Sequence, residues 1–98
     1  MTATQTLTQT ISTVRSNYAA LRRLKVSGGR TAATTNAISR RRNAIEAACK
    51  NLPRNVAGDL AYENTLLENM AVSRRNGVQR PELAARLANC RRDINAGA

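Results

Sequence analysis

Residues 7–29 read LTQTISTVRSNYAALRRLKVSGG, and their apolar side chains recur at spacings of four, three, four and three. This spacing places them along one side of an α-helix. The pair Gly28-Gly29 follows, and glycine commonly ends helices. The segment therefore predicts a helix from about residue 6 to the glycine pair, with one apolar face. That face consists of Leu7, Ile11, Val14, Tyr18 and Leu21.

Three more helices are expected downstream. The second is expected to begin at a cap within residues 34–36, which read Thr-Thr-Asn, and to run to about residue 51, before Leu52-Pro53. The third would be capped by Asn55 or Asp59 and end at Asn76-Gly77. The fourth would have a proline in its first turn and a glycine at its end. These two residues are Pro81 and Gly97.

Four helices, short connections and no convincing strand predict an all-α fold, a small bundle of two helical hairpins. We expect a single helical domain over residues 1–98. Its parts are a flexible, Thr-rich start at 1–5, a strongly basic hairpin at 6–52 and a near-neutral hairpin at 54–98. Phe and Trp are absent, so the core should be thin. We therefore expect oligomerisation or binding to stabilise it further.

Charge is distributed unevenly along the chain. The first 45 residues contain eight basic side chains and no Asp or Glu, whereas the other 53 contain eight basic and six acidic ones. A long segment of one sign repels itself unless an anion lies against it. Antiparallel pairing of the first two helices would bring most of these cations to one end of a hairpin. The eight candidate phosphate-contacting residues are Arg15, Arg22, Arg23, Lys25, Arg30, Arg40, Arg41 and Arg42.

Two readings of the basic residues stay open. Fourteen of the sixteen are Arg, whose planar guanidinium grips phosphate or carboxylate in two places. A GC-rich genome also favours Arg codons, and a solvated basic face keeps a small protein soluble. Arg41 and Arg42 lie on either side of Ile45, inside the apolar arc of the second helix. They either extend along that surface to water, reach into a partner, or pair with Glu63 or Glu68.

Catalytic and metal-binding signals are weak. The chain has no His, and its two cysteines, Cys49 and Cys90, form no CxxC pair. No phosphate loop, nucleophile elbow or dinucleotide fingerprint occurs. We therefore expect a non-enzymatic protein without a metal or other cofactor. No apolar run has the length of a membrane span, and no signal peptide is evident. The simplest setting is the cytoplasm, or a virion or host cytoplasm if the source is viral.

Residues 73–83 partly resemble the turn of a helix-turn-helix DNA-binding module, with Gly77 in the turn and Val78 after it. Asn76 and Arg86 stand where that module usually has apolar residues. An ordinary helical hairpin explains the pattern equally well.

The leading hypothesis is a non-enzymatic, all-α protein that binds the phosphate backbone of DNA or RNA through its basic half, as a small subunit of a nucleoprotein assembly. With two Tyr as the only aromatics, base stacking contributes little. The alternative is a helical protein–protein interaction module, such as an adaptor, virion component or inhibitor. It would dock on an acidic protein surface through the apolar face of the first helix. Burial of that face within the chain would disfavour the alternative.

Overall fold

The structure is a computed structural model, and it describes residues 6–27, 29 and 31–97. Within these residues the chain forms four α-helices and no strand, which confirms the all-α prediction. The expectations for residues 1–5, for Gly28 and for Arg30 lie outside the described residues. The helices are α1 (Leu7–Ser27), α2 (Ala32–Cys49), α3 (Arg54–Arg75) and α4 (Pro81–Gly97).

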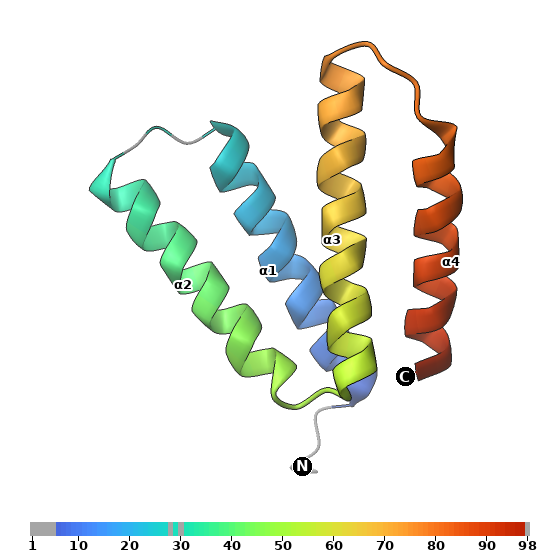
Figure 1. Ribbon diagram of the computed structural model, residues 1–98. Helices are drawn as coiled ribbons and strands as arrows, with labels where there is room; N and C mark the ends of the chain where they lie inside the picture. The colour runs from blue at the N-terminus through green and yellow to red at the C-terminus, as the bar shows by residue number, and fades with distance from the viewer. Residues whose placement is uncertain (1–5, 28, 30, 98) are drawn as a thin grey trace. The chain divides into compact units, whose positions relative to one another are not determined.

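The chain divides into two compact units, Met1–Pro53 and Arg54–Ala98. Each unit contains one pair of neighbouring helices, α1 with α2 and α3 with α4, as Figure 1 shows. The two predicted hairpins are therefore present. In the part of the chain that the structure describes, no helix is both long and apolar enough to cross a membrane.

The first helix begins where its sequence predicts. The backbone N–H of Gln9 donates to Thr6 Oγ1 (3.1 Å), and the backbone N–H of Thr6 donates to Gln9 Oε1 (3.0 Å). This reciprocal pair is a capping box, which satisfies backbone donors that have no partner inside the helix. It explains why α1 starts at Leu7.

The start of α2 differs from the expectation. Thr31 is the N-cap, with extended backbone angles (φ −85°, ψ 158°), and its hydroxyl accepts from the Thr34 backbone N–H at 3.1 Å. The predicted cap within residues 34–36 was therefore wrong. The two residues after Thr31 are alanines, the strongest helix formers, so the helix extends back to the first side chain able to cap it.

The turn between α2 and α3 ends one helix and starts the next within a few residues. Asn51 N–H donates to the carbonyl of Ala48 (3.0 Å), and Leu52 N–H donates to that of Cys49 (3.1 Å). Pro53 follows, and α3 begins directly after it at Arg54. The expected cap at Asn55 or Asp59 was wrong, because the proline places the break earlier than the first polar capping residue.

The end of α3 and the start of α4 follow the predicted signals. Gly77 has φ 69°, and the N–H groups of Gly77 and Val78 donate to the carbonyls of Arg74 (3.2 Å) and Ser73 (2.9 Å). This is a Schellman motif, whose left-handed residue favours glycine. Pro81 is the first residue of α4, and Gly97 is the last.

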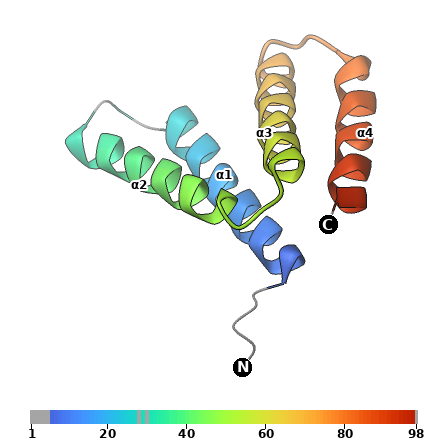
Figure 2. The ribbon, with the colours of Figure 1, turned by 60° about the horizontal axis from the view of Figure 1, so that its bottom comes forward.

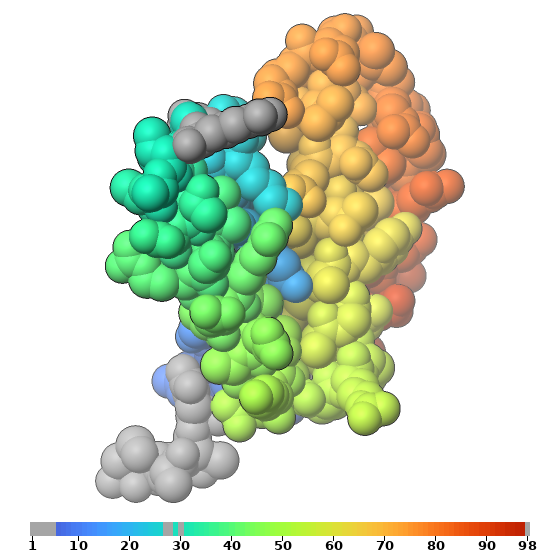
Figure 3. All heavy atoms as spheres, turned by 60° about the vertical axis from the view of Figure 1, so that its left-hand side comes forward, coloured from blue at the N-terminus to red at the C-terminus, as the bar shows by residue number. Residues whose placement is uncertain are grey.

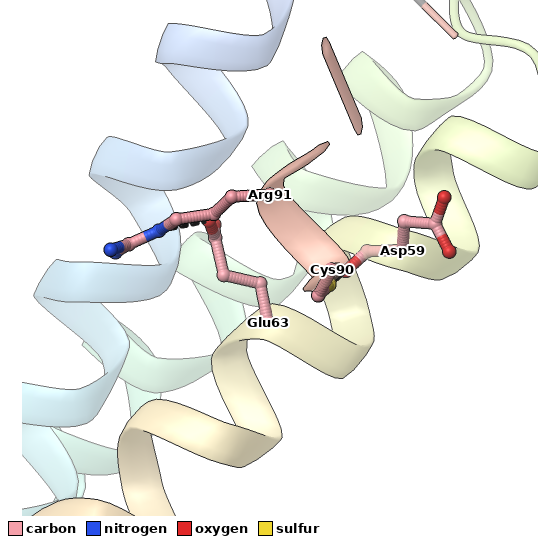
Figure 4. Close-up of polar contacts among 4 residues, drawn as sticks. All are labelled: Asp59, Glu63, Cys90 and Arg91. Carbon is pink, nitrogen blue, oxygen red and sulfur yellow. Dashed lines mark hydrogen bonds and ion pairs between the residues drawn. The ribbon is translucent and has the colours of Figure 1, made fainter. Parts of the chain in front are cut away.

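Helices α3 and α4 are antiparallel along their whole length (Figure 2). Near one end, Gly97 approaches Val56; further along, the Cys90 thiol donates to the Asp59 carbonyl (3.1 Å), and Arg91 Nε donates to Glu63 Oε2 at 3.0 Å. Figure 4 shows the latter two contacts. This is an ordinary helical hairpin, unlike the two helices of a helix-turn-helix module, which cross at about 90–120°. Its buried apolar side chains are Val56, Leu60, Leu66, Leu83, Leu87, Cys90 and Ile94.

The apolar face predicted for the first helix is mostly inside the structure. Ile11, Val14 and Leu21 are buried, whereas Leu7 and Tyr18 are half-buried. On α2, Ile45 is buried as well. The core therefore uses aliphatic side chains of moderate size, as expected for a chain without Phe or Trp.

Two glycines on the second hairpin should respond in opposite ways to alanine. A Cβ at Gly97 would lie 2.8 Å from Val56 Cγ2, whereas a Cβ at Gly58 meets nothing within 4 Å. We predict that Gly97→Ala destabilises the protein by about 1–3 kcal/mol through overpacking. Gly58→Ala, inside α3, should stabilise it by about 0.5–1 kcal/mol. Urea unfolding followed by circular dichroism measures both, and a stabilising Gly97→Ala would contradict the close approach.

Candidate nucleic-acid interface

The surface between α1 and α2 contains two neighbouring hollows lined by arginine. The first, of about 280 Å³, is lined by Asn17, Ala37, Arg40, Arg41 and Ala44. The second, of about 250 Å³, adjoins it, because it shares two of these residues. Its lining consists of Ala20, Arg23, Leu24, Ala37 and Arg41. The small alanine side chains of both helices leave these hollows unfilled, and three arginines line them.

Arg41 lines both hollows, and its guanidinium is held by a neighbouring amide. Its Nη1 donates to Asn17 Oδ1 at 3.1 Å, and Asn17 Nδ2 donates to the Thr13 carbonyl at 3.0 Å. A carbonyl can only accept and a guanidinium can only donate, so the two partners together determine the orientation of the amide. Asn17 is buried, with 9% of its surface exposed, whereas Arg41 is exposed.

Asn17 was not among the site residues expected from the sequence. It lies three residues after Val14 and four before Leu21, on the apolar side of α1. A polar side chain at such a position requires a hydrogen-bond partner when buried. Arg41 sits in the same way on the apolar arc of α2. The two residues are hydrogen-bond partners. The signal available in the sequence was that each is a polar residue on the apolar side of its helix.

The structure brings together three of the eight expected cations around the hollows: Arg23, Arg40 and Arg41. Arg15 and Arg22 lie elsewhere on α1, roughly 160° around the helix axis from Asn17 and Leu24 respectively. They belong to the side of α1 that faces away from these hollows.

Two more of the expected cations, Arg42 and Lys25, do not line the hollows. Arg42 is exposed on α2, roughly 100° around the axis from Arg41, and Lys25 is exposed in the last turn of α1. Arg30 lies outside the described residues. In Figure 3, α2 (teal to green) is at the front of this hairpin and presents its outer face to solvent, with α1 (blue) behind it. The basic residues of α2 thus lie on an accessible helix.

The first hairpin is far more positive than the second. Residues 1–53 contain nine basic side chains and one acid, Glu46, for a net charge of +8. Residues 54–98 contain seven basic and five acidic side chains, for a net charge of +2. A positive field concentrated on one hairpin attracts anions there.

In the second hairpin, two of the seven arginines contact carboxylates. Arg91 contacts Glu63, whose side chain is only 4% exposed, and Arg80 Nε contacts Glu82 Oε1 at 2.9 Å. The pKa of Glu82 is lowered by its own backbone N–H at the helix N-terminus and then by Arg80. Glu63 thus has a partner on α4, and Glu68 accepts from the Asn64 amide (3.4 Å).

Two titratable groups of the first hairpin, Tyr18 and Cys49, have raised pKa values. Burial raises the pKa of the Cys49 thiol. Burial, and then the neighbouring Cys49, raise the pKa of the Tyr18 hydroxyl. Both groups therefore favour their neutral forms, the opposite of what activates a cysteine nucleophile. Among the described residues, no group of three or more His, Cys, Asp or Glu side chains is placed to hold a metal ion.

Comparison of the chain with protein-family models, curated proteins and solved structures found no match.

The two cysteines should differ in reactivity. At pH 8 we predict that Cys49 reacts with iodoacetamide more slowly than glutathione does, because its raised pKa lowers the thiolate fraction. Its rate should keep rising above pH 9. Cys90 is buried and donates to the Asp59 carbonyl, so it should react only after unfolding. Mass spectrometry of labelled peptides measures both rates, and rapid labelling of Cys49 at pH 7 would contradict this assignment.

Proposed function

We propose that this protein is a non-enzymatic nucleic-acid-binding protein that contacts the phosphate backbone through the arginines of the α1–α2 hairpin. The observation that carries the proposal is the pair of hollows lined by Arg23, Arg40 and Arg41 on the hairpin that holds most of the net charge. Guanidinium groups bind phosphate oxygens in a two-point fork. Contacts of this kind position a protein on nucleic acid without reading its sequence.

The nature of the lining favours backbone contact over base recognition. Single-strand readers stack bases on aromatic side chains. The residues that line the two hollows are arginine, asparagine, leucine and alanine. Binding should therefore vary little with base sequence and fall steeply with salt.

Docking on an acidic protein surface receives less support. That alternative relied on the apolar face of the first helix as the contact surface. Three of its members, Ile11, Val14 and Leu21, have at most 5% of their surface exposed. A face buried in this way is part of the core and offers little to a partner helix.

The test is fluorescence anisotropy with labelled single-stranded and duplex DNA and RNA over a salt series. We predict a linear fall of log affinity with log salt. The double variant Arg23→Glu/Arg40→Glu should weaken binding to every sequence by at least about tenfold. It should also reduce the salt slope by about 2. Both side chains are exposed, so the hairpin should remain folded.

The matched control is Arg75→Glu/Arg92→Glu, which makes the same charge change at two exposed positions of the second hairpin. Its effect on affinity should be clearly smaller. Equal losses in both double variants would mean that net charge alone matters, and the site assignment would fail. If the wild-type protein binds none of the four ligands at low salt, the proposed function itself is wrong.

A further inference from the structure

Arg41 differs from the fixed arginines of the second hairpin in the kind of group that holds it. Arg91 and Arg80 contact the carboxylates of Glu63 and Glu82, which offset their charge. Arg41 contacts the neutral amide of Asn17. An amide orients a guanidinium and leaves its full positive charge available to a ligand.

A side chain that is already oriented before its ligand arrives binds that ligand more tightly. A free Arg side chain loses conformational entropy when it is fixed on a ligand. Asn17 is itself fixed by Thr13 and by burial, so part of that ordering of Arg41 occurs on folding. One of the five N–H donors of Arg41 is used by Asn17, and the others remain for a ligand.

The hollows on either side of Arg41 have room for phosphate groups. They measure about 280 and 250 Å³, and a water molecule occupies about 30 Å³. Five heavy atoms of that size, as in a phosphate, would occupy about 150 Å³, so each hollow is large enough for one phosphate. Arg40 lines one hollow, Arg23 lines the other, and Arg41 lines both. This arrangement matches two anions linked in a row.

We infer that the two hollows seat two successive phosphates of one nucleic-acid strand. Arg41 lies between the phosphates, Arg40 contacts one, Arg23 contacts the other, and Asn17 is the positioning residue for Arg41. The inference rests on the proposed function and adds to it the ligand unit, a phosphodiester strand, and a residue that carries no charge. Binding then depends on the direction of Arg41 as well as on its charge.

A double-mutant cycle tests the role of Asn17. The variants are Asn17→Leu, Arg41→Gln and their combination, measured with a labelled 15-nucleotide oligo-dT. Asn17→Leu should lower affinity about three- to tenfold with an unchanged salt slope, since Arg41 keeps its charge. Arg41→Gln should lower the slope by about 1. The combined variant should bind like Arg41→Gln alone, because Asn17 acts only through Arg41.

A second substitution separates positioning from packing. Asn17→Asp keeps an acceptor for Arg41 but offsets its charge, so affinity and slope should both fall, the slope by about 1. The matched control is Asn64→Leu, which removes a buried helical amide that donates to Glu68. It should leave binding unchanged. Circular dichroism confirms that each variant is folded.

Two further ligands test whether the two hollows bind a nucleic-acid backbone. An abasic 15-mer of deoxyribose phosphates should bind within about threefold of oligo-dT, and inorganic polyphosphate of equal charge should bind more weakly. Loss of binding to the abasic strand, or preference for polyphosphate, would overturn the assignment of the seat to a nucleic-acid backbone. If the wild-type protein binds oligo-dT but Asn17→Leu has no effect, or has an equal effect in the Arg41→Gln background, this inference fails and the proposed function stands.

Discussion

The structure depends on one packing constraint, the burial of aliphatic faces between paired helices. Without Phe or Trp, no single side chain of this chain buries a large area, so each hairpin must gather many small contributions along its length. In the second hairpin, the buried aliphatic side chains are spread along both helices, from Val56 to Leu66 on α3 and from Leu83 to Ile94 on α4. In the first hairpin, alanines at positions 20, 37 and 44 line the space between the helices. The hollows that carry the proposed function follow from the same small side chains.

The two hairpins differ in the partners of their oriented arginines and in their net charge. In the second, carboxylates on the same unit accept from Arg80 and Arg91, and the pairs contribute to local structure. The first hairpin contains one acidic and nine basic residues. Its Arg41 donates to the amide of the buried Asn17. Surface ion pairs stabilise a fold by at most about 1 kcal/mol each. Fold stability alone therefore gives little reason for the excess of positive charge in the first hairpin.

Local sequence signals located the helix ends well wherever a strong backbone preference acted. The glycine at the end of α3, Gly77, and the proline at the start of α4 were both predicted, because each signal involves residues within a few positions of one another. The misplaced ends have a shared cause. Capping side chains are common in this chain, so the sequence offered several candidates near each start, and alanine propensity or the break at Pro53 chose among them. Distinguishing such candidates requires the competing backbone energies, which differ by about 1 kcal/mol.

The sequence by itself determined the helical class, the two hairpins and the excess of positive charge in the first, because periodicity, turn residues and charge are properties of neighbouring positions. Only the tertiary structure decided which cations lie close together. Arg23, Arg40 and Arg41 meet around two hollows, whereas Arg15 and Arg22 lie on another side of α1. The pairing of Asn17 with Arg41 spans 24 positions of sequence. Such contacts depend on how one helix is rotated against another, and that rotation is set by the packing of both faces together.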